Sequence, residues 1–170
     1  MSQVRNSRAQ RIIFRILVGG ASRLLCQGPS WRSFFVDVCG YEASRCPIIP
    51  NWVADEAYLE LGASRSYGAD RPIRLLFVGW LSEGKGIFEL LEAVRQLSQE
   101  KANVDLVLDV CGEGAASQQA REFAARHRLP VRFHGWVTGE QKRSIFANAT
   151  IFVLPSHAEG FPNAMVEAMA

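Results

Sequence analysis

The sequence predicts an α/β fold, arranged as part of a doubly wound parallel sheet. Short, near-continuous apolar runs recur through the second half of the chain, which is typical of strands buried on both faces of a parallel sheet. Apolar residues recur at helical spacing between these runs, so strand and helix alternate. Open sheets of this kind usually have about six strands. Because fewer are expected here, we expect the chain to be a fragment of a two-domain protein.

The expected elements follow the chain in regular order. The apolar runs predict strands at residues 73–78, 104–110, 131–134 and 151–154. Helical spacing predicts helices that start near residues 87, 116 and 138. Thr138 and Gln141 have the spacing of a capping box, which supports a helix start there. Pro162 stands where a last helix would begin, because its missing N–H is not needed in the first helical turn.

The composition of residues 54–72 predicts a linker, because glycine and serine recur there. We therefore place a domain boundary in this segment. It separates residues 1–53 from an incomplete domain at 73–170.

The charge of the chain does not indicate a nucleic-acid partner, but its distribution leaves contact with a membrane surface open. A net charge of +2 gives no argument for nucleic-acid binding. Residues 1–36 nevertheless carry six arginines and no acidic residue. A basic amphipathic helix is therefore expected within residues 1–20. It either packs its apolar side on its own domain or contacts an anionic membrane surface.

The cysteines and the apolar runs indicate a cytoplasmic protein, with peripheral contact to the cytoplasmic face of a membrane as the alternative. The four cysteines include no C-x-x-C pair, which favours buried thiols in a reduced compartment. No apolar run approaches the ~18 residues of a membrane span. The three scattered histidines do not form a metal-binding pattern.

Two carboxylates lie close to the start of the last expected helix. Glu159 precedes this helix, in the loop that follows the fourth expected strand. Asn163 and Glu167 are four residues apart, so a helix places both on one face. Met165 and Met169 share another face and are expected to point to the core. Ligands of open α/β sheets bind at the carboxyl ends of the strands, so this stretch is a candidate binding site.

The string Pro-Ser-x-x-Glu-Gly-Phe-Pro-Asn-Ala-x-x-Glu-Ala, which begins at Pro155, resembles the E-x7-E signature of the retaining GT-B glycosyltransferases of family 4 (glycosyl transferases group 1). The resemblance implies two Rossmann-like domains, residues 1–53 being the tail of the N-terminal, acceptor-side domain. It also implies a hexosyltransferase-type enzyme. Such an enzyme moves a sugar from a nucleotide-diphosphate sugar to a glycan or lipid-linked acceptor, with retention, in polysaccharide or cell-envelope glycan synthesis.

The resemblance also implies roles for residues of this string. Glu159 would be catalytic and engage the donor sugar near the reacting carbon. Glu167 would hydrogen-bond the ribose hydroxyls of the donor. Backbone N–H groups around Gly160, Phe161 and Asn163 would hold sugar hydroxyls or phosphate.

Two further loops complete the expected donor site. The loop that starts at Gly79 resembles the family's Gly-Arg-Leu-x-x-x-Lys-Gly, in which an arginine and a lysine bind the donor diphosphate. Lys85 matches the lysine, whereas Trp80 stands in place of the arginine. Trp136 and Val137 lie where the family contacts the nucleotide base. The family typically needs no metal or other cofactor.

Two alternatives remain open from the sequence. The first is a nucleotide-binding fragment without catalysis. The second is an NTPase, because Gly-x4-Gly-Lys at 79–85 is close to the phosphate loop and Asp109 could help to hold magnesium. Gly86 stands where that loop requires a serine or threonine hydroxyl, so the NTPase pattern is incomplete.

Overall fold

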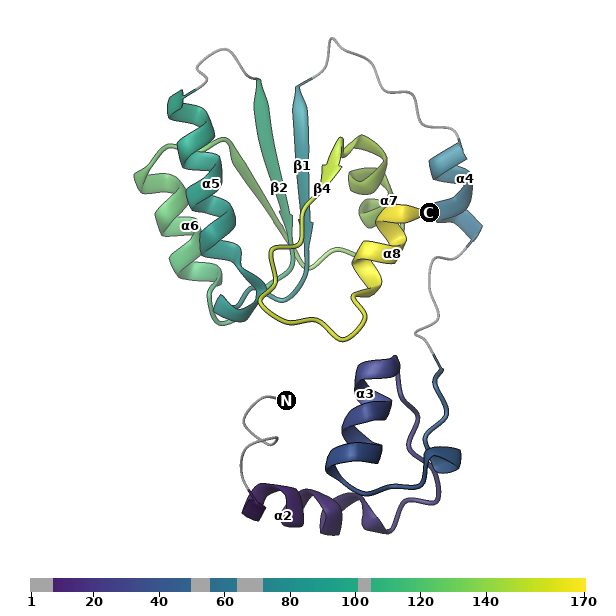
Figure 1. Cartoon of the computed structure of the whole chain (residues 1–170). Coiled ribbons are helices and arrows are strands. Elements are labelled where there is room, and N and C mark those ends of the chain that lie inside the picture. The colour runs from purple at the N-terminus through teal and green to yellow at the C-terminus, as the bar shows by residue number, and fades with distance from the viewer. Residues whose placement is uncertain (1–7, 50–55, 64–71, 101–104) are drawn as a thin grey trace. The chain divides into compact units, whose positions relative to one another are not determined.

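The computed structural model describes residues 8–49, 56–63, 72–100 and 105–170, and it divides into two compact units, Met1–Trp52 and Val53–Ala170. Figure 1 shows both units, and each is described here by itself. The unit boundary lies close to the expected domain boundary. The assignment of residues 1–53 to an acceptor-side domain stays a prediction.

The first unit is a small helical assembly around an aromatic and cysteine core. Helix α2 (Arg8–Gly19) is followed by α3 (Pro29–Ser33), the π-helical turn η1 (Phe34–Val38) and the 3-10 turn η2 (Ala43–Arg45). The buried core residues are Cys26, Phe34, Phe35, Cys39 and Cys46. Within the described residues of the chain, no helix is both long and apolar enough to cross a membrane.

Helix α2 confirms the expected amphipathic helix, but its apolar side is mostly exposed. Phe14 packs edge-on against Phe34, with ring centroids 5.5 Å apart. Ile16 and Leu17 are 73% and 76% exposed. The helix therefore packs on its own unit through the side that carries Phe14.

The second unit contains a parallel four-stranded sheet in the order β3-β2-β1-β4. The strands are β1 (Ile73–Val78), β2 (Leu106–Cys111), β3 (Val131–Gly135) and β4 (Ile151–Phe152). The chain moves outward to β3 and then returns to the other side of β1. This is the strand order of a doubly wound sheet, so the expected α/β fold is confirmed.

Helices cover both faces of this sheet (Figure 1). Helices α5 (Ile87–Glu100) and α6 (Ser117–Arg126) pack on the face that carries Phe77 and Val110. Helices α4 (Glu56–Ala63), α7 (Gly139–Asn148) and α8 (Asn163–Met169) lie on the face that carries Leu76. Successive strand residues point to opposite faces, so the central strands β1 and β2 contribute to both cores.

Four details differ from the expectations. The segment expected as a linker contains α4, whose Tyr58 is 7% exposed and packs edge-on against Phe146. The fourth strand comprises only the two residues of β4, which lies at the edge of the sheet order. Thr138 occupies the N-cap of α7, but its side chain makes no capping hydrogen bond. Met165 and Met169 are 38% and 77% exposed, so the expectation that they point to the core is wrong.

Candidate functional site

A cavity of about 570 Å³ lies at the carboxyl-terminal edge of the sheet. It is bounded by the ends of β1 and β2, the loop after β3, and helices α4, α7 and α8. The lining residues are Tyr58, Val78, Gly79, Trp80, Cys111, Gly112, Trp136, Val137, Thr138, Gly139, Lys142, Arg143, Asn163, Ala164 and Glu167. This is the edge at which open α/β sheets bind their ligands.

At this edge, the backbones of the loops that follow β1 and β2 pack closely against each other. Gly112, which follows β2, has a φ of 135°, and a Cβ there would lie 1.9 Å from the carbonyl oxygen of Gly79. Any larger residue would push the two loops apart. Beside them, burial and the charge of Asp109 raise the pKa of the Cys111 thiol to about 12. The thiol is therefore protonated at neutral pH and is a poor nucleophile.

Glu167 is the acidic side chain of the cavity, and only one of its oxygens has a described partner. Lys142 of α7 donates from Nζ to Oε1 over 2.6 Å. The other oxygen, Oε2, is buried and accepts no hydrogen bond from the residues that the structure describes. The two side chains are 22% (Lys142) and 17% (Glu167) exposed. An unsatisfied buried acceptor is rare and costly, so it marks a place where a hydrogen-bond donor is missing.

Two exposed tryptophans stand at the mouth of the cavity. Trp80 follows the end of β1 and is 57% exposed, and Trp136 follows β3 and is 70% exposed. Val137 is buried next to Trp136, at 8% exposure. Aromatic faces at these positions can stack on a flat ring or on an apolar sugar face.

A second polar cluster joins the loop after β4 to the loop after β1. Lys85 Nζ donates to Glu159 Oε1 over 2.6 Å. His157 Nε2 lies 2.7 Å from Glu89 Oε1, and its backbone N–H donates to the carbonyl of Gly84. Burial raises the pKa of Glu159, but the hydrogen bond and the positive charge of Lys85 outweigh it and hold this pKa below its usual value. The Glu159 side chain is therefore a carboxylate at neutral pH.

The surroundings of Gly86 and of Asp109 argue against the NTPase alternative. Gly86 has a φ of 70°, and a Cβ there would lie 2.2 Å from the carbonyl oxygen of Pro155. A serine or threonine, which the phosphate loop requires at this position, does not fit. Asp109 is 2% exposed, and both of its oxygens are bound by Arg74 and His134. It cannot also serve as a magnesium ligand without breaking these contacts.

The structure divides the predicted site residues into two groups. One group lines the cavity and comprises Gly79, Trp136, Val137, Asn163 and Glu167. The other group comprises Lys85, at the end of the 3-10 turn η3 (Glu83–Lys85), and Glu159, Gly160 and Phe161, in the loop after β4. Asn163 and Glu167 do share one face of α8, as their spacing predicted.

Sequence reasoning missed the two basic residues of the cavity, Lys142 and Arg143. A signal was available, because both lie in the first half of α7. A cation near a helix N-terminus is unfavourable unless an anion lies close by, and here Lys142 contacts Glu167. Among the described residues, no cluster of three or more His, Cys, Asp or Glu side chains is arranged to hold a metal ion.

Comparison with known proteins gives this site its context. Residues 64–170 match the model of the family described as glycosyl transferases group 1. TuaC of Bacillus subtilis (strain 168), named as a glycosyltransferase of teichuronic acid biosynthesis, is 30% identical over 92% of this chain and 38% of its own length. The D-inositol 3-phosphate glycosyltransferase of Pseudarthrobacter chlorophenolicus is 28% identical over 91% of this chain and 39% of its own. The chain thus spans about two fifths of the length of these relatives.

Solved structures agree on the fold. The pneumococcal O-GlcNAc transferase GtfA, solved in complex with UDP and GlcNAc, superposes with a TM-score of 0.73 at 18% identity, over 95% of this chain and 31% of its own. This likeness supports the GT-B-type fold that the signature implied. Since the family model covers more than half of the sequence, the chain belongs to the glycosyl transferases group 1 family.

Proposed function

We propose that this protein transfers a sugar from a nucleotide-diphosphate sugar to a glycan or lipid-linked acceptor, with retention of configuration, in polysaccharide or cell-envelope glycan synthesis. The observation that carries the proposal is the position of Glu167. In a glycosyl transferases group 1 chain, this residue lines a cavity at the carboxyl edge of the sheet, and one of its oxygens lacks a donor. A ribose supplies two adjacent hydroxyl donors, which suit such a carboxylate.

The cavity is assigned to the nucleoside part of the donor. Glu167 accepts from the ribose hydroxyls, and Asn163 lies on the same helix face beside it. Trp136 and Val137 border the base, and Gly79 leaves room for the backbone to approach the ligand. Uridine diphosphate is the first candidate, because the structurally similar GtfA was solved in complex with it.

The diphosphate and the sugar are assigned to the Lys85–Glu159 cluster. Lys85 neutralises the departing diphosphate, which stabilises the transition state electrostatically. To do so, it exchanges the Glu159 carboxylate, now 2.6 Å away, for a phosphate oxygen. Glu159 then remains as a carboxylate beside the reacting sugar carbon, and backbone N–H groups of Gly160 and Phe161 complete the cradle. In this proposal, no metal or other cofactor takes part.

The first unit is assigned to the tail of the acceptor-side domain, as the resemblance implies. The hexose identity of the donor sugar also belongs to the proposal. The assignment of the first unit draws support from the relatives that are named as glycosyltransferases, because they match this chain over most of its length.

Calorimetric titration of the chain with UDP, GDP and ADP and with the corresponding triphosphates, with and without magnesium, tests the proposal. We expect one of these diphosphates to bind equally well in both conditions. Lys85→Ala should weaken its binding about tenfold, because one charge-assisted phosphate contact is lost. The exposed Arg126→Met variant is the matched control for loss of one positive charge. Binding of nucleoside triphosphates alone, and only with magnesium, would contradict the proposal.

A further inference from the structure

We infer that Lys142 is a positioning residue, which holds the Glu167 carboxylate in place for a vicinal diol of the ligand. The inference rests on the proposed function, in which Glu167 accepts from the ribose. It adds a residue of α7 to that site. The E-x7-E signature does not include this residue.

The contacts of Lys142 are directed at one carboxylate. Its Nζ lies 2.6 Å from Glu167 Oε1 and 5.7 Å from the ring centroid of Phe146. Phe146 belongs to the buried core and is 4% exposed, so its ring is a fixed surface. Lys142 is thus held between a rigid ring and Glu167, and it remains mostly buried.

The consequence lies in the two oxygens of Glu167. Lys142 binds Oε1, which leaves Oε2 as the acceptor without a described partner. The last torsion of a glutamate side chain is broad, so the carboxylate can turn toward the cavity at low cost. The ammonium group of Lys142 has three donors and can follow either oxygen during this turn. A ligand hydroxyl would then supply the missing hydrogen bond while the ion pair stays intact.

A purely structural role is the competing explanation. The ion pair also joins α7 to α8, and such a link could act only on stability. A third role is a general cation that attracts any phosphate. The three roles differ in one measurable quantity, which is the preference of the protein for a ribonucleotide over its 2′-deoxy analogue.

The experiment compares the affinities of the full chain for UDP and 2′-deoxy-UDP, or for the corresponding pair if another base binds better. In the unaltered chain we expect the ribonucleotide to bind about tenfold more tightly, because the 2′-deoxy analogue lacks one hydrogen-bond donor to the Glu167 carboxylate. Lys142→Met should reduce this ratio at least threefold. Arg126→Met, which removes an exposed charge on α6, should leave the ratio unchanged.

The outcomes separate the inference from the proposed function. If the unaltered chain binds no nucleoside diphosphate, or if Glu167→Gln keeps the full ratio, the proposed function fails and the inference fails with it. If Glu167→Gln lowers the ratio but a folded Lys142→Met variant does not, the inference alone is wrong. Equal weakening of both nucleotides would also overturn it, because it would make Lys142 a general cation.

A second variant covers the case in which Lys142→Met does not fold. Lys142→Gln keeps a hydrogen-bond donor but loses the charge. We expect its ratio to lie between those of the unaltered chain and Glu167→Gln. A ratio equal to that of the unaltered chain would contradict the inference.

Discussion

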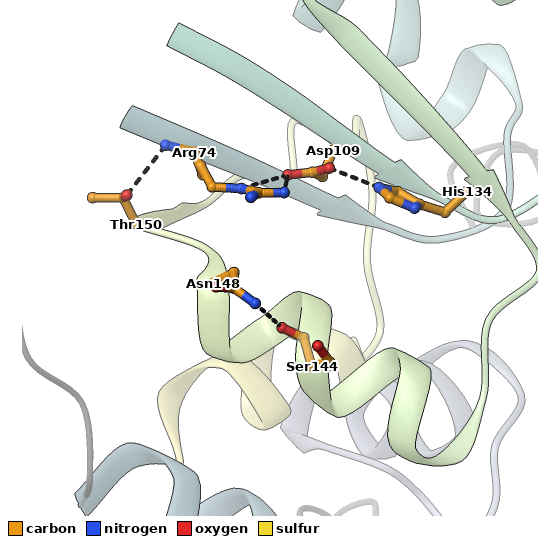
Figure 2. Close-up of polar contacts among 6 residues, drawn as sticks. All are labelled: Arg74, Asp109, His134, Ser144, Asn148 and Thr150. Atoms are coloured by element: carbon orange, nitrogen blue, oxygen red, sulfur yellow. Dashed lines mark hydrogen bonds and ion pairs between the residues drawn. The ribbon is translucent and has the colours of Figure 1, made fainter. Parts of the chain in front are cut away.

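Asp109 and Glu167 are both mostly buried carboxylates with basic partners, yet their hydrogen bonding differs. Asp109 Oδ2 accepts from Arg74 Nε and Nη2 at 3.0 and 2.8 Å, and Oδ1 lies 2.7 Å from His134 Nε2 (Figure 2). Both of its oxygens are therefore satisfied within the protein. Glu167 has one bond, from Lys142, and one buried oxygen without a described partner.

The position of each carboxylate matches this difference. Asp109 lies within β2 and joins three neighbouring strands across one face of the sheet (Figure 2). Arg74 also donates its backbone N–H to Thr150 Oγ1, which ties β1 to the residue just before β4. Glu167 lies on α8 and lines the cavity. A satisfied carboxylate within the sheet stabilises the fold, whereas a half-satisfied one at the cavity is available to a ligand.

The largest expected effect is on stability, at Asp109. Asp109→Ala should lower the free energy of unfolding by about 3 kcal/mol, because it leaves the Arg74 charge without its buried partner. Urea denaturation measures this change. The control is Glu113→Ala, which breaks the more exposed ion pair with Arg121 and should cost clearly less, because water screens exposed charges. Equal losses of unfolding free energy in the two variants would contradict the structural role assigned to Asp109.

The next expected effect, at Glu167, is on ligand affinity as well as on stability. Glu167→Gln should lower the free energy of unfolding by less than Asp109→Ala does, by about 1–2 kcal/mol, because the amide oxygen can still accept from Lys142 and only the charge of the pair is lost. Its affinity for the nucleoside diphosphate should fall about tenfold, or about 1.4 kcal/mol. Calorimetric titration and urea denaturation of the same preparation measure both quantities. A large loss of stability with unchanged affinity would reverse the comparison.

The smallest expected effect is the pH dependence of the Lys85–Glu159 pair. The pKa of Glu159 is lower in the folded chain than its usual value. The pair therefore stabilises the fold above the usual glutamate pKa, and this contribution is lost as the pH falls through the lower, folded value. Glu159→Gln should remove this component, which we expect to be about 0.5 kcal/mol or less for a solvated pair. Urea denaturation between pH 7 and pH 3 measures it, and an identical pH profile in the variant would contradict the assignment.

The sheet could be predicted from the sequence because its signal is local. Apolar runs such as Ile73–Val78 are continuous, and each strand is separated from the next by one helix. The edge strand β4 was predicted too long, because the apolar run continues through Val153 and Leu154, beyond the two residues in register with β1, although Val153 still donates its backbone N–H to Leu76. Tyr58 was assigned to a linker, since its packing against Phe146 depends on a residue far along the chain.

The candidate site was predictable only where a signature covers it. Glu159 and Glu167 lie in one short string, and their neighbours identify them. Lys142 has no such string, and its role depends on a contact across 25 positions of sequence. The pairing of Lys85 with Glu159 across 74 positions also could not be read from spacing. Contacts of this kind become visible only in the folded chain.

The most direct test is a crystal structure of the chain with bound nucleoside diphosphate. Our account predicts the nucleoside in the cavity, with a ribose hydroxyl within about 3.2 Å of a Glu167 oxygen and Lys142 still paired with the other. The diphosphate should contact Lys85, and Glu159 should be released from it. A nucleotide bound elsewhere, or bound in the cavity without contact to Glu167, would contradict the account.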